Sequence, residues 1–90
     1  MSSADFRIEI DPSAVRDLRK LHHTQPELIR KVRHLIDGLA SDPLQGKPLS
    51  GNKRGCHSLR YGDYRIVYEV HTSLHVIHII DVGHRREVYR

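Results

Sequence analysis

Two arginines are predicted to face each other across a β-hairpin in the second half of the chain. The stretch LRYGDYRIVYEV, residues 59–70, has aromatic and β-branched residues on both sides of Gly62-Asp63, which predicts two strands joined by a two-residue turn. That turn places Arg60 opposite Arg65, with β-carbons about 5 Å apart, where like charges destabilise a sheet. The pair therefore predicts a site for an anion. The alternative is a polar sheet face with both guanidinium groups in water.

Basic residues precede this hairpin, so the charge distribution also favours an anionic partner. The chain has a formal net charge of +4 at pH 7, and the whole excess lies after Gln45. Lys47, Lys53 and Arg54 come before the hairpin with no acidic residue among them. A local basic surface concentrates polyanions, and nucleic acid is the natural candidate. Charge alone is weak evidence, because many small proteins are this basic.

The alternation of side chains divides the hairpin into two faces. One face is apolar and aromatic and is predicted to enter the core; it holds Leu59, Tyr61, Tyr64, Ile66, Tyr68 and Val70. The other face is predicted to lie away from the core; it holds Ser58, Arg60, Arg65, Val67 and Glu69. The two arginines therefore belong to a surface that the core does not use.

Size and composition indicate one small globular domain over residues 1–90. The chain is 38% hydrophobic and 29% charged, which is ordinary for such a domain. Its single cysteine, Cys56, has no partner for an internal disulfide, which fits a reducing compartment. The sequence contains no run of 18 apolar residues and no signal-peptide layout at its N-terminus. We therefore expect a cytoplasmic protein that does not enter a membrane.

The remaining elements follow from periodicity and from breakers. Phe6, Ile8 and Ile10 alternate with charged residues and predict a strand. Asp11-Pro12 predicts a helix start, and this helix is expected to close at His22-His23. A second helix is predicted to start at Thr24, which has the capping-box spacing to Glu27, and to stop before Pro43. Residues 43–55 are predicted to form a loop, and a last strand runs over residues 74–82 until Gly83 breaks it.

This order predicts an α+β fold. An N-terminal strand is followed by a two-helix hairpin and then by a three-strand antiparallel meander, with the helices packed on one face of the sheet. The other face is left open, and Arg60 and Arg65 project from it. The tail after the last strand is expected to return Arg85 and Tyr89 to the same neighbourhood.

The eight histidines do not predict a metal site. His75 and His78 are expected on opposite faces of the last strand, so they do not share an ion there. His22-His23 has no third ligand at a recognisable spacing. Cys56-His57 has the residue types of a nucleophile and base, but neighbouring strand residues point apart, so a structural cysteine is favoured. We expect neither a metal nor another cofactor.

The motifs GDYRIVYEV and VGHRREVY, together with Leu18–Leu21 and the loop with Gly46 and Leu49, resemble the RelE/ParE superfamily of toxin-antitoxin toxins. The resemblance covers nearly the whole chain and implies a RelE-like fold. The ending with an arginine and then a tyrosine is most similar to the RelE branch. Its members are mRNA interferases, ribosome-dependent endoribonucleases that cut messenger RNA in the ribosomal A site without a metal and so inhibit translation.

The resemblance also implies a catalytic group made of Arg60, Arg65, Arg85 and Tyr89. Cleavage of RNA by its own 2′-hydroxyl needs a base, positive charge on the crowded phosphate and an acid for the leaving 5′-oxygen. Arg60 and Arg65 are assigned to the phosphate, Tyr89 to the base, and Arg85 to charge stabilisation or the acid role. A phenol has an ordinary pKa of about 10, so neighbouring cations must favour the phenolate. Without the resemblance, Tyr89 is better explained as an aromatic cover for the sheet edge.

Ser58 and His84 lie near this group in the sequence and bear on its chemistry. Ser58 stands where the family has a lysine on the strand before the turn, so this chain has one cation fewer than that pattern. His84 is an alternative acid or base, because the ordinary pKa of imidazole is nearer neutrality. Lys47, Lys53 and Arg54 become RNA-binding residues under the same resemblance.

The resemblance implies three partners: a cognate antitoxin, the ribosome with its mRNA, and operator DNA bound only through the antitoxin complex. Two other functions stay open. One is a ParE-like inhibitor of DNA gyrase, which shares the fold but does not need the arginine and tyrosine cluster. The other is a non-catalytic module that binds nucleic acid or a protein partner through the basic face, with salt-sensitive binding and no cut product.

Overall fold

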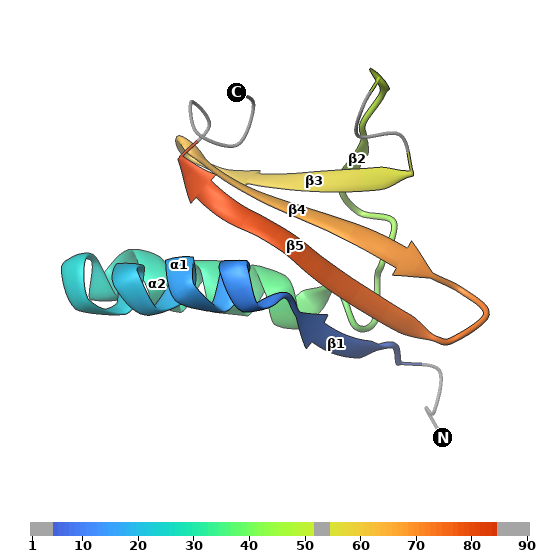
Figure 1. Cartoon of the computed structure of the whole chain (residues 1–90), viewed down its shortest axis with the longest axis horizontal. Coiled ribbons are helices and arrows are strands. Elements are labelled where there is room, and N and C mark those ends of the chain that lie inside the picture. The colour runs from blue at the N-terminus through green and yellow to red at the C-terminus, as the bar shows by residue number, and fades with distance from the viewer. Residues whose placement is uncertain (1–4, 52–54, 85–90) are drawn as a thin grey trace.

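The computed structural model describes residues 5–51 and 55–84, which form a five-stranded sheet with two helices on one face (Figure 1). The elements in chain order are β1 (Arg7–Ile10), α1 (Pro12–Thr24), α2 (Pro26–Gly38), β2 (Lys47–Pro48), β3 (Cys56–Tyr61), β4 (Tyr64–His71) and β5 (Val76–His84). The strand order is β1-β5-β4-β3-β2. β1 pairs with β5 in parallel, and the other pairs are antiparallel. The predicted α+β architecture is confirmed.

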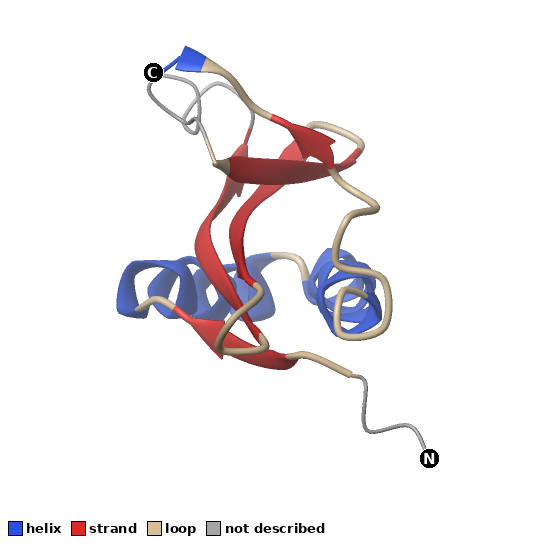
Figure 2. Ribbon diagram, turned by 90° about the vertical axis from the view of Figure 1, so that its right-hand side faces the viewer, coloured by secondary structure: helices blue, strands red, loops and turns tan. Residues whose placement is uncertain are grey.

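The main core lies between the helices and the sheet. Figure 2 shows the twist of the sheet and the helices beside it. The buried residues come from the apolar stripes of both helices and from one face of the central strands: Ala14, Leu21, Ile29, Val32, Ile36, Leu39, Ile66, Tyr68, Ile77, Ile79 and Val82. Within the described part of the chain, neither helix has the length and apolar composition that crossing a bilayer requires.

The helix starts agree with the sequence in one case and not in the other. Asp11 caps α1 as predicted, because its carboxylate accepts hydrogen bonds from the amide and hydroxyl of Ser13 at 3.1 and 2.7 Å. These bonds lower the pKa of Asp11. The predicted capping box at Thr24 is wrong: Thr24 is the last residue of α1, and its hydroxyl donates back to the Lys20 carbonyl. α2 begins at Pro26, and Gln25 caps it without a side-chain bond.

The predicted hairpin is confirmed residue by residue. Tyr61 pairs with Tyr64, Arg60 with Arg65 and Leu59 with Ile66. Gly62 has a φ of 60°, a conformation that glycine adopts without strain. One member of the predicted core is wrong, because Tyr61 lies near the turn and is 40% exposed.

Strand β5 differs from the prediction at both ends. The strand runs from Val76 to His84, so Gly83 lies inside it. Leu74 belongs to the preceding turn and is 72% exposed, while His75 has a φ of 59° there. The glycine does not break the strand because β4 supplies a paired neighbour opposite it.

A second, smaller apolar cluster covers part of the sheet face away from the helices, which we call the open face. It consists of buried Cys56 and Val67 with Leu49 and Ile80 packed against them. A β-bulge lies here: Val67 pairs with Asp81 but Tyr68 pairs with Ile79, so Ile80 is the additional residue. The open face is therefore not wholly polar, which corrects the expectation for Val67.

The loop over residues 43–55 contains the two-residue strand β2, which the sequence did not predict. The loop is held by the buried Tyr68 hydroxyl, which accepts from the Gly46 amide at 3.0 Å and donates to the Pro43 carbonyl at 2.8 Å. Burial raises the pKa of this phenol. A β-carbon at Gly46 would lie against the Tyr68 hydroxyl and 2.8 Å from the Ser58 carbonyl oxygen. Glycine is therefore required for β2 to reach the edge of the sheet.

Candidate functional site

The arginine pair lies on the open face, at the turn end of the β3–β4 hairpin. Arg60 and Arg65 are directly opposite in the ladder, so their side chains leave the same face. The neighbouring residues Leu59 and Ile66 point the other way and pack on the core. Arg60 is exposed and Arg65 is half-buried. The structure thus brings two of the predicted site residues together on a surface that solvent reaches.

A glycine lies opposite Arg65 in the ladder between β4 and β5. Gly83 of β5 pairs with Arg65 and continues the row that begins at Arg60. Because glycine has no side chain, the third position of this row adds no side chain to the open face.

Lys47 adds a third cation to the same face. It is exposed on β2 and pairs with Ser58 of β3, which is 4% exposed. Ser58 is two residues from Arg60 along β3, a separation of about 7 Å. A row of paired residues crosses the sheet here from β2 to β5 and ends at an acidic residue: Lys47, Ser58, Val67 and Asp81. Positive charge is therefore concentrated over β2, β3 and the start of β4.

His84 lies on the helix-facing side of the sheet. It pairs with Tyr64, and the two rings meet edge to face with centroids 5.7 Å apart. The Tyr64 hydroxyl accepts a hydrogen bond from the Gln25 side chain at 3.0 Å. These residues and the end of α1 line a hollow of about 160 Å³. The structure therefore does not bring His84 to the arginine pair.

Four predicted site residues, Lys53, Arg54, Arg85 and Tyr89, lie outside the described residues. Their roles stay predictions. The described part of the site, two guanidinium groups and one ammonium on a sheet face, has the chemistry to bind a phosphate and stabilise added negative charge. Proton transfer by Arg85 and Tyr89 is among these predictions.

Sequence reasoning missed that Lys47 and Ser58 are neighbours. The signal was weak because β2 has two residues, too few for an alternation pattern. Pro48 also favoured the prediction of a loop, although proline is tolerated on an edge strand. A basic residue next to proline in a glycine-rich loop does not reveal which strand lies beside it.

The chain is similar to toxins of toxin-antitoxin systems. Residues 8–89 match the family described as "ParE toxin of type II toxin-antitoxin system, parDE". Toxin RelE of Mycobacterium tuberculosis is 36% identical over 88 residues, covering 94% of this chain and 87% of the relative. The mRNA interferase toxin RelE of Escherichia coli is 34% identical over 88 residues, covering 93% of this chain and 90% of the relative.

Solved structures show the same fold. A chain of the toxin-antitoxin complex RelBE2 from Mycobacterium tuberculosis superimposes with a TM-score of 0.79 and 31% identity, covering 90% of this chain and 99% of that chain. A chain of the archaeal RelE-RelB complex from Pyrococcus horikoshii gives a TM-score of 0.75 and 26% identity, covering 90% and 96%.

Proposed function

This chain belongs to the ParE toxin family of type II toxin-antitoxin systems, and we propose that it is an endoribonuclease toxin that cleaves messenger RNA on the ribosome. The resemblance read from its motifs is confirmed by the family match and by relatives named RelE. The curated relative from Escherichia coli is named an mRNA interferase, which supports RNA as the target.

One structural observation carries the proposal: Arg60 and Arg65 are held opposite each other on the open face. Two like charges at this spacing repel each other, and an anion between them would relieve that repulsion. The planar fork of each guanidinium matches phosphate oxygens. The pair therefore binds the scissile phosphate and stabilises the charge that builds up when the 2′-hydroxyl attacks.

Lys47 compensates for the family lysine that is absent at Ser58. It lies directly across the ladder from Ser58 and projects from the same face. An ammonium on a long flexible stem reaches the space above Ser58 from the edge strand. The site thus regains a third cation from a different strand, positioned to hold the RNA backbone beside the arginine pair.

Tyr89 and Arg85 supply proton transfer in this proposal. Tyr89 takes the 2′-hydroxyl proton, and its phenolate is favoured by the cations around it. Arg85 stabilises the leaving 5′-oxygen or protonates it. No metal takes part in these steps.

A cognate antitoxin is the proposed regulator, acting in the cytoplasm where translation takes place. The RelBE2 toxin of Mycobacterium tuberculosis was solved as a toxin-antitoxin complex. An antitoxin for this chain would carry acidic residues against Lys47, Arg60 and Arg65, either adding a strand or helix or displacing the C-terminal segment. Binding of operator DNA is assigned to the antitoxin part of the complex.

Inhibition of DNA gyrase is the second candidate function. The observation that favours it is the family description, which names a ParE toxin. This function shares the fold but does not require Arg85 and Tyr89. Variants at these two positions therefore separate the two candidates.

The test is cleavage of a defined message in a translating extract, with 5′ ends mapped by primer extension. We compare the wild-type protein with Arg65→Gln, Arg85→Ala and Tyr89→Phe. Arg33→Gln is the matched control, because Arg33 is exposed on α2, across the sheet from the site. Wild type and Arg33→Gln are expected to cut within A-site codons only when ribosomes are present. Arg65→Gln removes one phosphate-binding donor and is expected to slow cutting about 100-fold.

RNA cleavage would be contradicted if expression of the protein stops cell growth while the message in the translating extract stays intact. Inhibition of gyrase supercoiling by Arg85→Ala and wild type alike would then establish the second candidate. Salt-sensitive RNA binding with no cut product would instead show a non-catalytic module.

A further inference from the structure

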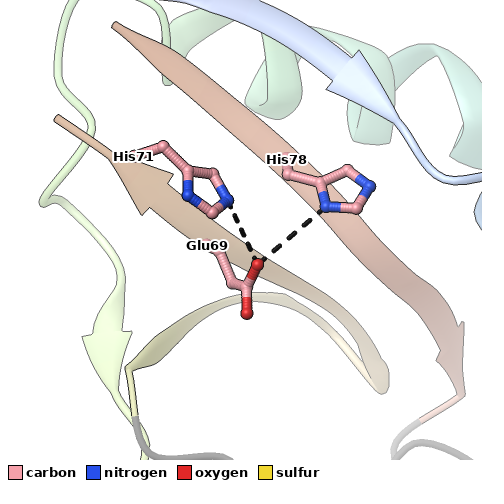
Figure 3. A group of neighbouring side chains, drawn as sticks. All are labelled: Glu69, His71 and His78. Atoms are coloured by element: carbon pink, nitrogen blue, oxygen red, sulfur yellow. Dashed lines mark hydrogen bonds and ion pairs between the residues drawn. The ribbon is translucent and has the colours of Figure 1, made fainter. Parts of the chain in front are cut away.

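A second cluster of chemistry-bearing side chains lies on the open face, at the end of the sheet far from the hairpin turn. Glu69 and His71 are two residues apart on β4, so they point to the same face. His78 of β5 pairs with Glu69 in the ladder. Figure 3 shows the Glu69 carboxylate pointing between the two imidazole rings. Two imidazoles and a carboxylate form a ligand set that Zn²⁺ takes.

The β-bulge creates this arrangement. If the register set by Arg65 opposite Gly83 continued without a bulge, Ile80 would lie opposite Tyr68 and Ile79 opposite Glu69. The bulge moves the pairing by one residue and brings His78 there instead. An interruption that re-aims one side chain is a common feature beside functional sites.

The distances fit a metal ion after small movements. His71 Nε2 is 3.2 Å from Glu69 Oε1, His78 Nδ1 is 4.0 Å from the same oxygen, and the three ligand atoms lie within 4.8 Å of one another. Ligands of a tetrahedral zinc ion, at 2.0–2.2 Å from the metal, lie about 3.3 Å apart. The distance between His71 Nε2 and Glu69 Oε1 already matches this value. Rotation of the three side chains, which are 34–41% exposed, would bring the other two distances to this value.

An outer layer of contacts orients two of these ligands. Asp11 Oδ1 lies 3.6 Å from Nε2 of His78, on the far side of the ring from Glu69. Asp11 therefore faces Nε2 of this ring, while Nδ1 faces Glu69 and is the atom available as the ligand. The Cys56 thiol donates weakly to Glu69 Oε2 at 4.0 Å, which leaves Oε1 directed at the histidines.

We propose that Glu69, His71 and His78 form a zinc-binding site that links β4 to β5. Three protein ligands leave a fourth position for water or for a ligand from a partner. The site is four residues along β4 from Arg65, about 13 Å away, so it is separate from the proposed RNA chemistry. This set is not evident in the sequence, because only the register joins position 78 to position 69.

The test is zinc binding by the full chain without an affinity tag, after dialysis against a chelator. Calorimetric titration with ZnCl₂ at pH 7.5 is expected to show one ion per chain. At zinc concentrations about 100-fold above Kd, the Tm is expected to rise by about 10–20 °C. Titration with Co²⁺ is expected to give the visible absorption of a tetrahedral site.

Variants locate the ion. His78→Gln and Glu69→Gln are expected to bind zinc at least about 10-fold more weakly, and the half-exposed positions let both variants fold, which circular dichroism checks. His34→Gln and His22→Gln are the controls, on exposed helix positions. The proposal is overturned if wild type shows no binding, if His78→Gln binds as wild type does, or if His22→Gln alone loses the ion. None of these outcomes depends on RNA cleavage.

Discussion

Replacing Arg60 by glutamine is expected to stabilise the fold while it weakens the function. Arg60 is exposed and directly opposite Arg65, and the ion pairs found among the described residues do not include it. Like charges at opposed positions of a sheet cost about 0.2–1 kcal/mol. For a domain of this size that corresponds to a rise in Tm of about 1–8 °C. Glutamine keeps part of the aliphatic stem, so little packing is lost.

Thermal unfolding followed by circular dichroism measures this effect at low and at high salt. The rise in Tm is expected in about 20 mM NaCl and is expected to shrink in about 500 mM NaCl, because the Debye length falls several-fold. Arg33→Gln is the matched control: it removes the same charge from an exposed helix position and has no opposed arginine. Its Tm should change less than that of Arg60→Gln at low salt.

The opposite result would refute the reasoning about the anion site. A lower Tm for Arg60→Gln at low salt would mean that the two guanidinium groups already stabilise the sheet without a ligand. Cleavage is the second readout and is expected to fall about 100-fold. A more stable protein with weaker cutting would show that the repulsion is retained for phosphate binding.

Three further predictions concern the loop and the edge strand. Tyr68→Phe removes the partner of the Gly46 amide and the Pro43 carbonyl and is expected to cost about 1–3 kcal/mol in chemical denaturation. Because burial raises the folded-state pKa of Tyr68, wild type should keep this advantage below about pH 10 and lose it as the pH rises through the raised pKa; a gap that persists at higher pH would contradict this. Gly46→Ala should lower stability by about 1–3 kcal/mol, since its β-carbon meets the Ser58 carbonyl; an unchanged Tm would show that the loop moves aside. Lys47→Gln should leave the Tm unchanged and reduce the salt slope of single-stranded RNA binding by about 0.7, and an unchanged slope would remove Lys47 from the site.

Local patterns were sufficient for the hairpin and for the helices. A two-residue turn leaves one register for its strands, so Arg60 had to oppose Arg65. The apolar stripes of the helices identified the buried side of the core, including Val32 and Ile36. The boundary at Thr24 was wrong because a capping box is only a local preference, and Pro26 started the second helix two residues later.

Pairing between distant segments was beyond local patterns. β1 lies beside β5 although about 66 residues separate them in the chain, and no short-range signal encodes this contact. The loop that contains the two-residue strand β2 is held by the Tyr68 hydroxyl, which lies more than 20 residues away in the chain. Gly83 remains in a strand because β4 pairs with it, which outweighs the low strand propensity of glycine.

The sequence by itself determined that two arginines share a sheet face and that the chain carries the motifs of a toxin family. Only the tertiary structure decided how the other polar side chains are grouped. It placed Lys47 across from Ser58 and turned His84 to the helix side of the sheet. The bulge at Ile80 brought His78 to Glu69. The physical reason is that a hairpin fixes its register within a few residues, whereas neighbouring strands acquire theirs from core packing along their whole length.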